Sequence, residues 1–321
     1  MLYNIQIPNE ASVHILRSFL SRNLFFSEDA TEFEIAFHPR FVYLQPFALA
    51  MLAAWGYDCR QRQIPIRCPN VDTSYVDYAW RMGLFGELGI AYEPKRHIHE
   101  EAGRFIPLRR ITRGSDVQAF LADVAPLLHR PEHIQAVQYC FSELIRNVLE
   151  HAGGAPAFAC AQYYHAPRRV SIGVADCGIG LLKSLRRAFN IAEDSDAILE
   201  ALTPGVTGSP PQMYGSPDNA GVGLFFTKSI AKASGEYFAI FSGTSAFRLR
   251  RRRHREQLRL FVDPRADRHD IYQGLPNWHG TVVAVDIGVR QERGFDQTMA
   301  AIREAISADK QPADDVRVKF T

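Results

Sequence analysis

The sequence predicts an α/β fold in two domains, and three observations carry that prediction. The chain has 321 residues, whereas one domain commonly holds about 100 to 200. Apolar residues make up 46% of it, which is enough for a large core and too many for a disordered chain. Strand-like runs alternate with helical runs early in the chain, and helices with further strands follow. We expect an α/β domain at 1–105 and, at 106–321, helices covering one face of a mixed, mainly antiparallel sheet.

The first segment alternates between the two kinds of element. Hydrophobic periodicity predicts helices at 13–20, 46–55 and 74–82 and strands at 33–37 and 63–67. Gly56 and Gly83 are expected to end the last two helices, because glycine is common just after a helix. The stretch 94–114 is rich in charge and glycine and has no sustained period, so the domain junction is expected there.

The second segment carries clearer helix signals. Ser115 is expected to cap a helix that reaches Arg130, and Pro131 to open the next helix, which ends near Ala152. Between Thr203 and Gly223, prolines and glycines are too dense for a regular element, and we expect a lid over a site. The remaining predicted elements are strands at 169–175, 237–242 and 281–287 and a helix at 224–234.

Charge and composition exclude several classes of protein. The chain carries 37 Lys and Arg against 35 Asp and Glu, so its net charge of +2 gives no global attraction to nucleic acid or to a membrane. The apolar run Phe47–Tyr57 is far shorter than the roughly 20 residues of a membrane-spanning helix. The amino terminus has no secretory pattern, which favours a cytoplasmic protein. Five cysteines without a Cys-x-x-Cys pair argue against disulfides and structural zinc.

Three motifs could carry chemistry. Glu143, Asn147 and His151 recur every four residues on the predicted helix and form one polar stripe, although a solvated face has the same pattern. Asp176 follows a predicted strand and precedes Gly178 and Gly180, as it would also do in an ordinary turn. Gly221, Gly223 and Leu224 open a helix whose free N–H groups suit phosphate. Their spacing fits neither a P-loop nor the dinucleotide-binding fingerprint.

The motifs together, with Gly280-Thr281 ahead of the last predicted strand, resemble the GHKL ATP-binding family of gyrase, Hsp90, histidine kinases and MutL. The form Glu-x-x-x-Asn-x-x-x-His is similar to the anti-sigma-factor serine kinases. The resemblance implies an ATP and Mg²⁺ site. Within it, Asp176 accepts the adenine amino group with support from Thr281, and Gly178 and Gly180 line the adenine. It also implies that Asn147 holds Mg²⁺, that Gly221, Gly223 and Leu224 bind phosphate, and that Glu143 is the general base.

Residues 30–90 resemble, more weakly, the STAS fold of anti-sigma-factor antagonists. The strand before His38, the helix after Leu44 and the segment Gly83-Leu84-Phe85 fall in the expected order. Such antagonists carry a phosphorylatable Ser or Thr at the start of the first helix, where this chain has Gln45-Pro46-Phe47. Phosphorylation of this domain by the usual route is therefore not expected.

Three functions remain open. The leading hypothesis is a bacterial regulator that binds ATP and Mg²⁺ and controls a protein partner, as a switch or as an anti-sigma-type serine/threonine kinase. The second is an ATP-hydrolysing machine whose closing lid drives homodimerisation. The third is a nucleotide-free interaction module that uses the segment Arg248–Arg268, in which nine arginines outnumber three acidic residues by six. A solvated hairpin that links two sheet strands is the favoured explanation of that segment, because no aromatic residues interrupt Arg250–Arg255 to stack on bases. A histidine kinase is disfavoured, because the segment ahead of Glu143 is too short for two long helices.

Overall fold

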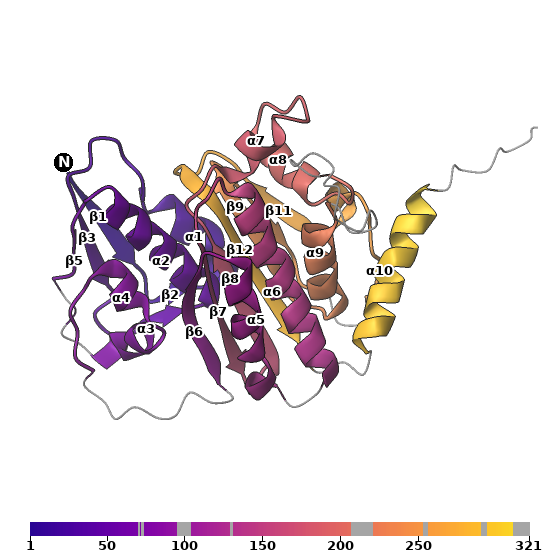
Figure 1. The fold of residues 1–321 in the computed structure, drawn as a ribbon, viewed down its shortest axis with the longest axis horizontal. Coiled ribbons are helices and arrows are strands. Elements are labelled where there is room, and N and C mark those ends of the chain that lie inside the picture. The colour runs from indigo at the N-terminus through magenta and orange to yellow at the C-terminus, as the bar shows by residue number, and fades with distance from the viewer. Residues whose placement is uncertain are drawn as a thin grey trace, which may run out of the picture.

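The computed structural model describes residues 1–69, 71, 74–94, 104–128, 131–206, 221–252, 256–289 and 294–310, which form a layered α/β structure (Figure 1). A parallel sheet has the order β1-β3-β5, and β2 pairs with β4 beside it. Their bounds are β1 (Leu2–Ile7), β2 (Glu10–Ala11), β3 (Glu32–Phe37), β4 (Tyr43–Leu44) and β5 (Ile66–Arg67).

A larger sheet of seven strands follows, in the order β11-β10-β9-β12-β8-β7-β6, and all its neighbours run antiparallel. The structure is thus mixed α/β with a mainly antiparallel main sheet, as the sequence predicts. The bounds are β6 (Phe105–Ile111), β7 (Ala157–Tyr164), β8 (Arg169–Ala175), β9 (Phe238–Gly243), β10 (Ser245–Leu249), β11 (His269–Tyr272) and β12 (Trp278–Gly288).

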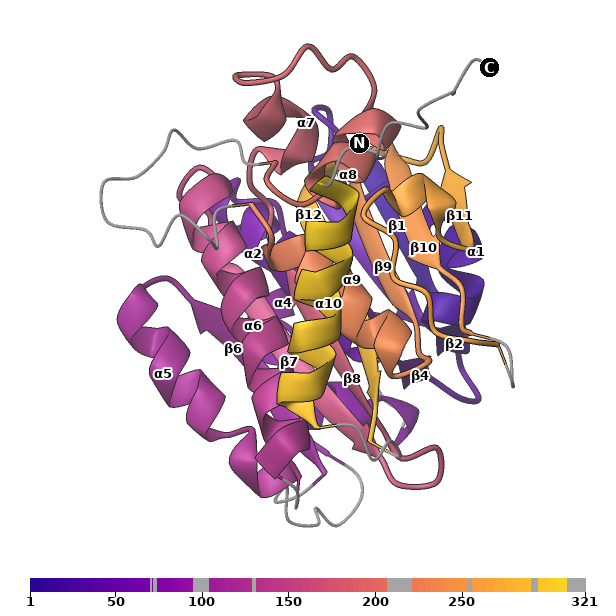
Figure 2. The same ribbon diagram turned by 90° about the vertical axis from the view of Figure 1, so that its right-hand side faces the viewer.

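Helices cover both faces of the larger sheet. One face packs against α5, α6 and α9, and α10 lies outside α6 and α9 (Figure 2). The opposite face packs against α2, which separates it from the parallel sheet (Figure 1). The α-helices are α1 (Leu16–Ser21), α2 (Pro46–Gln61), α3 (Asp77–Arg81), α4 (Leu84–Leu88), α5 (Gly114–Ala122), α6 (Pro131–His151), α7 (Gly180–Leu185), α8 (Asp194–Ala201), α9 (Gly223–Ala233) and α10 (Phe295–Lys310). Short 3-10 turns lie at Val13–Ile15, Ser74–Val76, Ala125–Leu127 and Pro264–Ala266.

The helix α2 is buried along most of its length, because both of its sides meet a sheet. Its first turn lies directly on β8, where a side chain at Gly173 would place Cβ 2.2 Å from the backbone carbon of Pro46. The thiol of Cys160 in β7 donates a hydrogen bond of 3.3 Å to the Pro46 carbonyl. Residues of α2, of the parallel sheet and of the inner face of the larger sheet therefore share one hydrophobic core. The division at 1–105 and 106–321 stays a prediction.

Three local predictions were wrong. Gly56 does not end a helix but lies inside α2, where its missing side chain lets the backbone of Glu87 approach: a Cβ there would lie 2.6 Å from the Glu87 carbonyl oxygen. The stretch 94–114, expected to hold no regular element, contains β6, the edge strand of the larger sheet, while 95–103 lie outside the described residues. Ser115 lies in the first turn of α5 and not at its N-cap, and that helix ends at Ala122.

The cysteines agree with the expectation of mostly buried side chains. Cys59, Cys140 and Cys160 are buried, and Cys68 and Cys177 are partly exposed. Across the described part of the chain, none of the helices combines the length and the apolar character needed to cross a membrane.

The contact between Gly173 and α2 predicts that Gly173→Ala destabilises the protein by about 3 kcal/mol, because the added methyl group meets backbone atoms that cannot rotate away. Urea unfolding of the variant and the wild type measures the change. Gly114→Ala is the control, since nothing lies within 4 Å of a Cβ added there. Equal stability of Gly173→Ala and the wild type would show that α2 does not sit on β8 in solution.

Candidate functional site

The three motifs come together at one end of the central strands of the larger sheet, where β8 ends and β12 begins. We call this end the Asp176 edge. The C-terminal end of α6 and the helix α7 lie at this edge, and α9 starts near it (Figure 1). The sequence places them there because β8 and β12 are antiparallel neighbours, so that the end of β8 meets the start of β12. The predicted lid residues 207–220 lie outside the described residues.

Asp176 is the buried centre of this edge, with 3% of its surface exposed. One carboxylate oxygen accepts the backbone N–H of Gly178 at 2.7 Å, and the other accepts the N–H of Thr281 at 3.2 Å. The Asp176 N–H in turn donates to the Thr281 carbonyl at 2.9 Å. Thr281 therefore supports Asp176 through its backbone, and Gly280 (φ +99°) leaves space beside the carboxylate.

Burial sets the protonation of Asp176. Loss of hydration raises the pKa of its carboxyl to about 7, although the two backbone N–H groups that it accepts act in the opposite direction. A carboxyl with such a pKa changes its charge near neutral pH. Perturbed groups of this kind are concentrated at functional sites, although structural networks show them as well.

The turn after Asp176 is joined to the end of α6. The N–H of Ile179 donates to the Ala152 carbonyl at 3.2 Å, and a Cβ at Gly178 would lie 2.1 Å from that same oxygen. Gly178 is therefore needed for close approach to α6. Gly180 (φ +73°) opens α7 in a conformation that favours glycine.

The other end of the polar stripe on α6 reaches the first turn of α9. A Cβ at Gly223 would lie 2.3 Å from a carboxylate oxygen of Glu143, so the Glu143 side chain occupies the space that Gly223 leaves free. Glu143 also pairs with Arg146 at 2.6 Å. Burial raises the pKa of Glu143, and the nearby Arg146 partly offsets that effect.

Asn147 and His151 lie on the same stripe between these two contacts. Asn147 is one helical turn after Glu143 and is half-buried. His151 is one turn further, and burial lowers the pKa of its imidazole, which favours the neutral form. The structure thus brings Glu143, Asn147 and Asp176 to one edge, with the start of α9 beside them.

The two ends of the predicted lid meet. The N–H of Gly205 donates to the Gly221 carbonyl at 3.0 Å, and Gly221 (φ +72°) leaves space for the backbone of Val206. Leu224 follows at the start of α9, where the first backbone N–H groups have no partner within the helix. These N–H groups and the positive end of the helix dipole are suited to an anion.

Two residues that sequence reasoning did not single out hold this edge together. The Ser242 hydroxyl donates to the Gly280 carbonyl at 2.7 Å and accepts the N–H of Leu181 at 3.0 Å, which ties α7 to β9 and β12. The indole N–H of Trp278 donates to the Asp176 carbonyl at 3.1 Å. Their roles follow from strand register, which the sequence does not reveal.

The donor set suits Mg²⁺ bound together with phosphates better than a metal held by protein alone. Asn147 offers an amide oxygen, a hard donor that Mg²⁺ accepts, and Mg²⁺ commonly takes most other ligands from water and substrate phosphates. Within the described residues, no three His, Cys, Asp or Glu side chains are grouped to hold a metal ion.

The raised pKa of Asp176 predicts a pH-dependent stability. In the unfolded chain this carboxyl ionises near pH 3.9, about 3 units below its folded pKa of about 7. Between these values the folded state holds a proton that the unfolded state has lost, so this group makes stability fall as the pH rises from 4 to 7.

We expect Asp176→Asn to remove about 3 kcal/mol of that loss when urea unfolding is compared at pH 4.5 and pH 8. Asp123→Asn, at an exposed position, should keep the wild-type difference. If Asp176→Asn shows the same difference in unfolding free energy between pH 4.5 and pH 8 as the wild type, the Asp176 carboxyl is ionised throughout that range.

Comparison with known proteins found no match for this chain. No family model matches the chain, and no curated protein is similar enough to count as a match. The resemblance described above thus depends on four short motifs, and the functional reading depends on how the structure arranges them.

Proposed function

We propose that this chain binds ATP with Mg²⁺ at the edge formed by β8, β12, α6 and α9, and acts as a regulatory switch or an anti-sigma-type serine/threonine kinase on a protein partner. One observation carries the proposal: the buried carboxylate of Asp176 lies at the same edge as the stripe of Glu143 and Asn147 and the start of α9. That order matches the order of adenine, metal and phosphate in a bound nucleotide.

The residue roles follow the motif resemblance and agree with the chemistry of each group. The ionised carboxylate of Asp176 accepts the adenine amino group, beside Gly178 and Gly180. Asn147 supplies an oxygen to Mg²⁺, which neutralises phosphate charge when bound. Gly221, Gly223 and Leu224 present backbone N–H groups to the phosphates.

Glu143 is the proposed general base. Its carboxylate lies against Gly223, and its pKa is raised by burial toward the range in which a base is effective. Arg146 at 2.6 Å orients it. The proton acceptor is thus beside the proposed phosphate position, where it can act on a water or on a hydroxyl of a partner.

The switch role is supported by a contact between the parallel-sheet side of the molecule and this edge. Phe26, before β3, stacks on His279 with ring centroids 4.2 Å apart and meets Trp278 edge-on at 5.1 Å. Trp278 in turn donates to the Asp176 carbonyl. A change at Asp176 can therefore reach the segment around Phe26 through one side chain, and the reverse holds by linkage.

Calorimetric titration of ATP with Mg²⁺ tests the nucleotide site. We expect one ATP per chain for the wild type, and a loss of affinity of at least tenfold in Asp176→Asn, because a buried acceptor is replaced by a group that donates toward N–H groups. The exposed variant Asp123→Asn should bind as the wild type does. Wild-type protein that binds no ATP at millimolar concentration would overturn the proposal.

The same samples, assayed for free phosphate and for labelled protein, separate the activities. Label on an added partner supports a kinase, and bound ATP without turnover supports a switch. Free phosphate without a partner supports the alternative of an ATP-hydrolysing machine, for which Glu143→Gln should abolish release. A protein that needs no nucleotide would act as the interaction module considered above.

The Phe26 contact predicts that Phe26→Ala weakens ATP binding about threefold or more, because Trp278 loses the ring that fixes it against Asp176. The stoichiometry should stay at one, which distinguishes lost positioning from partial unfolding. Phe41→Ala is the control, since Phe41 is 56% exposed. An unchanged affinity in Phe26→Ala would show that the two sides of the molecule act independently.

A further inference from the structure

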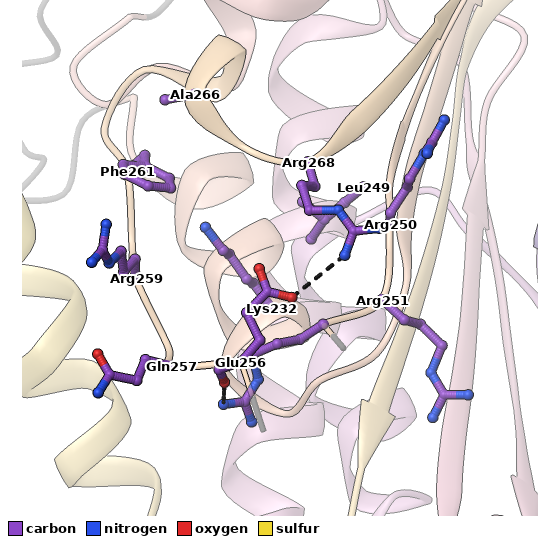
Figure 3. Close-up of a pocket in the computed structure, with 11 residues that line it drawn as sticks. Lys232, Leu249, Arg250, Arg251, Glu256, Gln257, Arg259, Phe261, Ala266 and Arg268 are labelled. Atoms are coloured by element: carbon purple, nitrogen blue, oxygen red, sulfur yellow. Dashed lines mark hydrogen bonds and ion pairs between the residues drawn. The ribbon is translucent and has the colours of Figure 1, made fainter. Parts of the chain in front are cut away.

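A cavity of about 480 Å³ lies at the C-terminal end of α9, beside the connection from β10 to β11 (Figure 3). Because α9 spans 11 residues, this end is about 15 Å from the start of the helix at Gly223. The cavity is thus separate from the proposed ATP site. Its lining holds one acidic residue, Glu256, and six basic ones: Lys232, Arg250, Arg251, Arg252, Arg259 and Arg268.

Two lysines at the C-terminal end of α9 share a single buried carboxylate beside the cavity. Lys228 and Lys232 on α9 both pair with the carboxylate of Asp267, whose side chain is fully buried. Lys228 is itself only 1% exposed, and burial lowers its pKa. Two ammonium groups therefore share one carboxylate at this end of α9. Of the two, Lys232 lines the cavity, where it also lies over the ring of Phe261 at 4.3 Å.

The wall of the cavity has the same imbalance. Figure 3 shows Arg268 turned toward Glu256, and its guanidinium lies 3.4 Å from the Glu256 carboxylate. The guanidinium of Arg252 donates to the backbone carbonyl of Glu256 at 3.0 Å, so it gains no carboxylate of its own from that contact. In contrast, Arg250 and Arg251 point away from Glu256 in this view.

A neighbouring carboxylate is shared in the same way. Asp270 pairs with both Arg248 and Arg250, and these two ion pairs hold the pKa of Asp270 below its usual range. The shared carboxylates therefore leave the region cationic, although the whole chain carries only +2.

The shape and the charge of the cavity together limit the ligand. Guanidinium and ammonium groups bind phosphate oxygens strongly, and several of them around one hollow suit more than one phosphate. A volume of about 480 Å³ lies within the range of small-molecule sites. Extended nucleic acid fits less well, because it usually needs a longer basic track with aromatic side chains for stacking.

We propose that this cavity is a second binding site, for a small anion with two or more phosphate groups, held by Lys232, Arg252 and Arg268. The site is independent of the proposed nucleotide function, because no residue of the Asp176 edge lines it. An anion bound here offsets positive charge of the lysine and arginine side chains that the carboxylates of Asp267 and Glu256 do not neutralise.

Titration of inorganic tripolyphosphate into the full chain, with EDTA to remove divalent cations, tests the site. We expect binding of one anion per chain that weakens as salt is added. The double variant Arg252→Gln/Arg268→Gln should weaken it at least tenfold, and orthophosphate should bind more weakly than tripolyphosphate. The same double variant should bind ATP with Mg²⁺ as the wild type does, which separates this site from the ATP site.

The control variant Arg22→Gln/Arg40→Gln removes the same charge from exposed positions on the parallel-sheet side of the molecule. Wild-type affinity in that control supports a defined site, and an equal loss in both double variants would reduce the effect to diffuse charge. The proposal is also overturned if tripolyphosphate does not bind, or if a single-stranded oligonucleotide binds more tightly than tripolyphosphate does. Thermal unfolding of each variant shows that the comparison concerns folded protein.

Discussion

The arrangement of both sheets depends on the close approach between the backbone of β8 and the first turn of α2. Gly173 makes this approach, since any side chain there would overlap with Pro46 and Phe47. The approach in turn buries α2 between two sheets, which explains why its sequence is apolar almost all round. The first turn of α2 is therefore interior, and its backbone is covered by β8 and by the thiol of Cys160 in β7.

Elements whose pattern is set by local sequence could be predicted. The amphipathic α6 and the apolar β8 were predicted with nearly correct ends, because caps, glycines and periodicity mark them. The strand β7 was not, since its alanines and cysteine give no alternation, although α2 and α6 cover its two faces. Gly56 was predicted wrongly because its role depends on a tertiary contact: it gives room to the backbone of α4, which is distant in sequence. Tertiary contacts decided these cases.

The candidate site shows the same division. The motif residues Glu143, Asn147 and Asp176 were singled out from spacing alone, and the structure brings them to one edge, while their roles in ATP binding stay predictions. Ser242 and Trp278 were not foreseen, because both depend on strand pairing. The pairing of β9 with β12 places Ser242 opposite Thr281, and the pairing of β12 with β8 brings Trp278 near Asp176. A single sequence offers no signal for such register-dependent partners.

The tryptophans give the molecule a property of their own. Of the three in the chain, Trp55 and Trp278 are fully buried, and the ring of Phe25 lies 5.7 Å from each of them. Trp55 belongs to α2, whereas Trp278 is the first residue of β12, the strand whose Thr281 hydrogen-bonds to Asp176. Indole emission depends on the polarity around the ring, so the natural fluorescence of this protein reports whether its two sides remain packed together. The chain thus carries an optical probe at the contact through which a regulatory signal would pass.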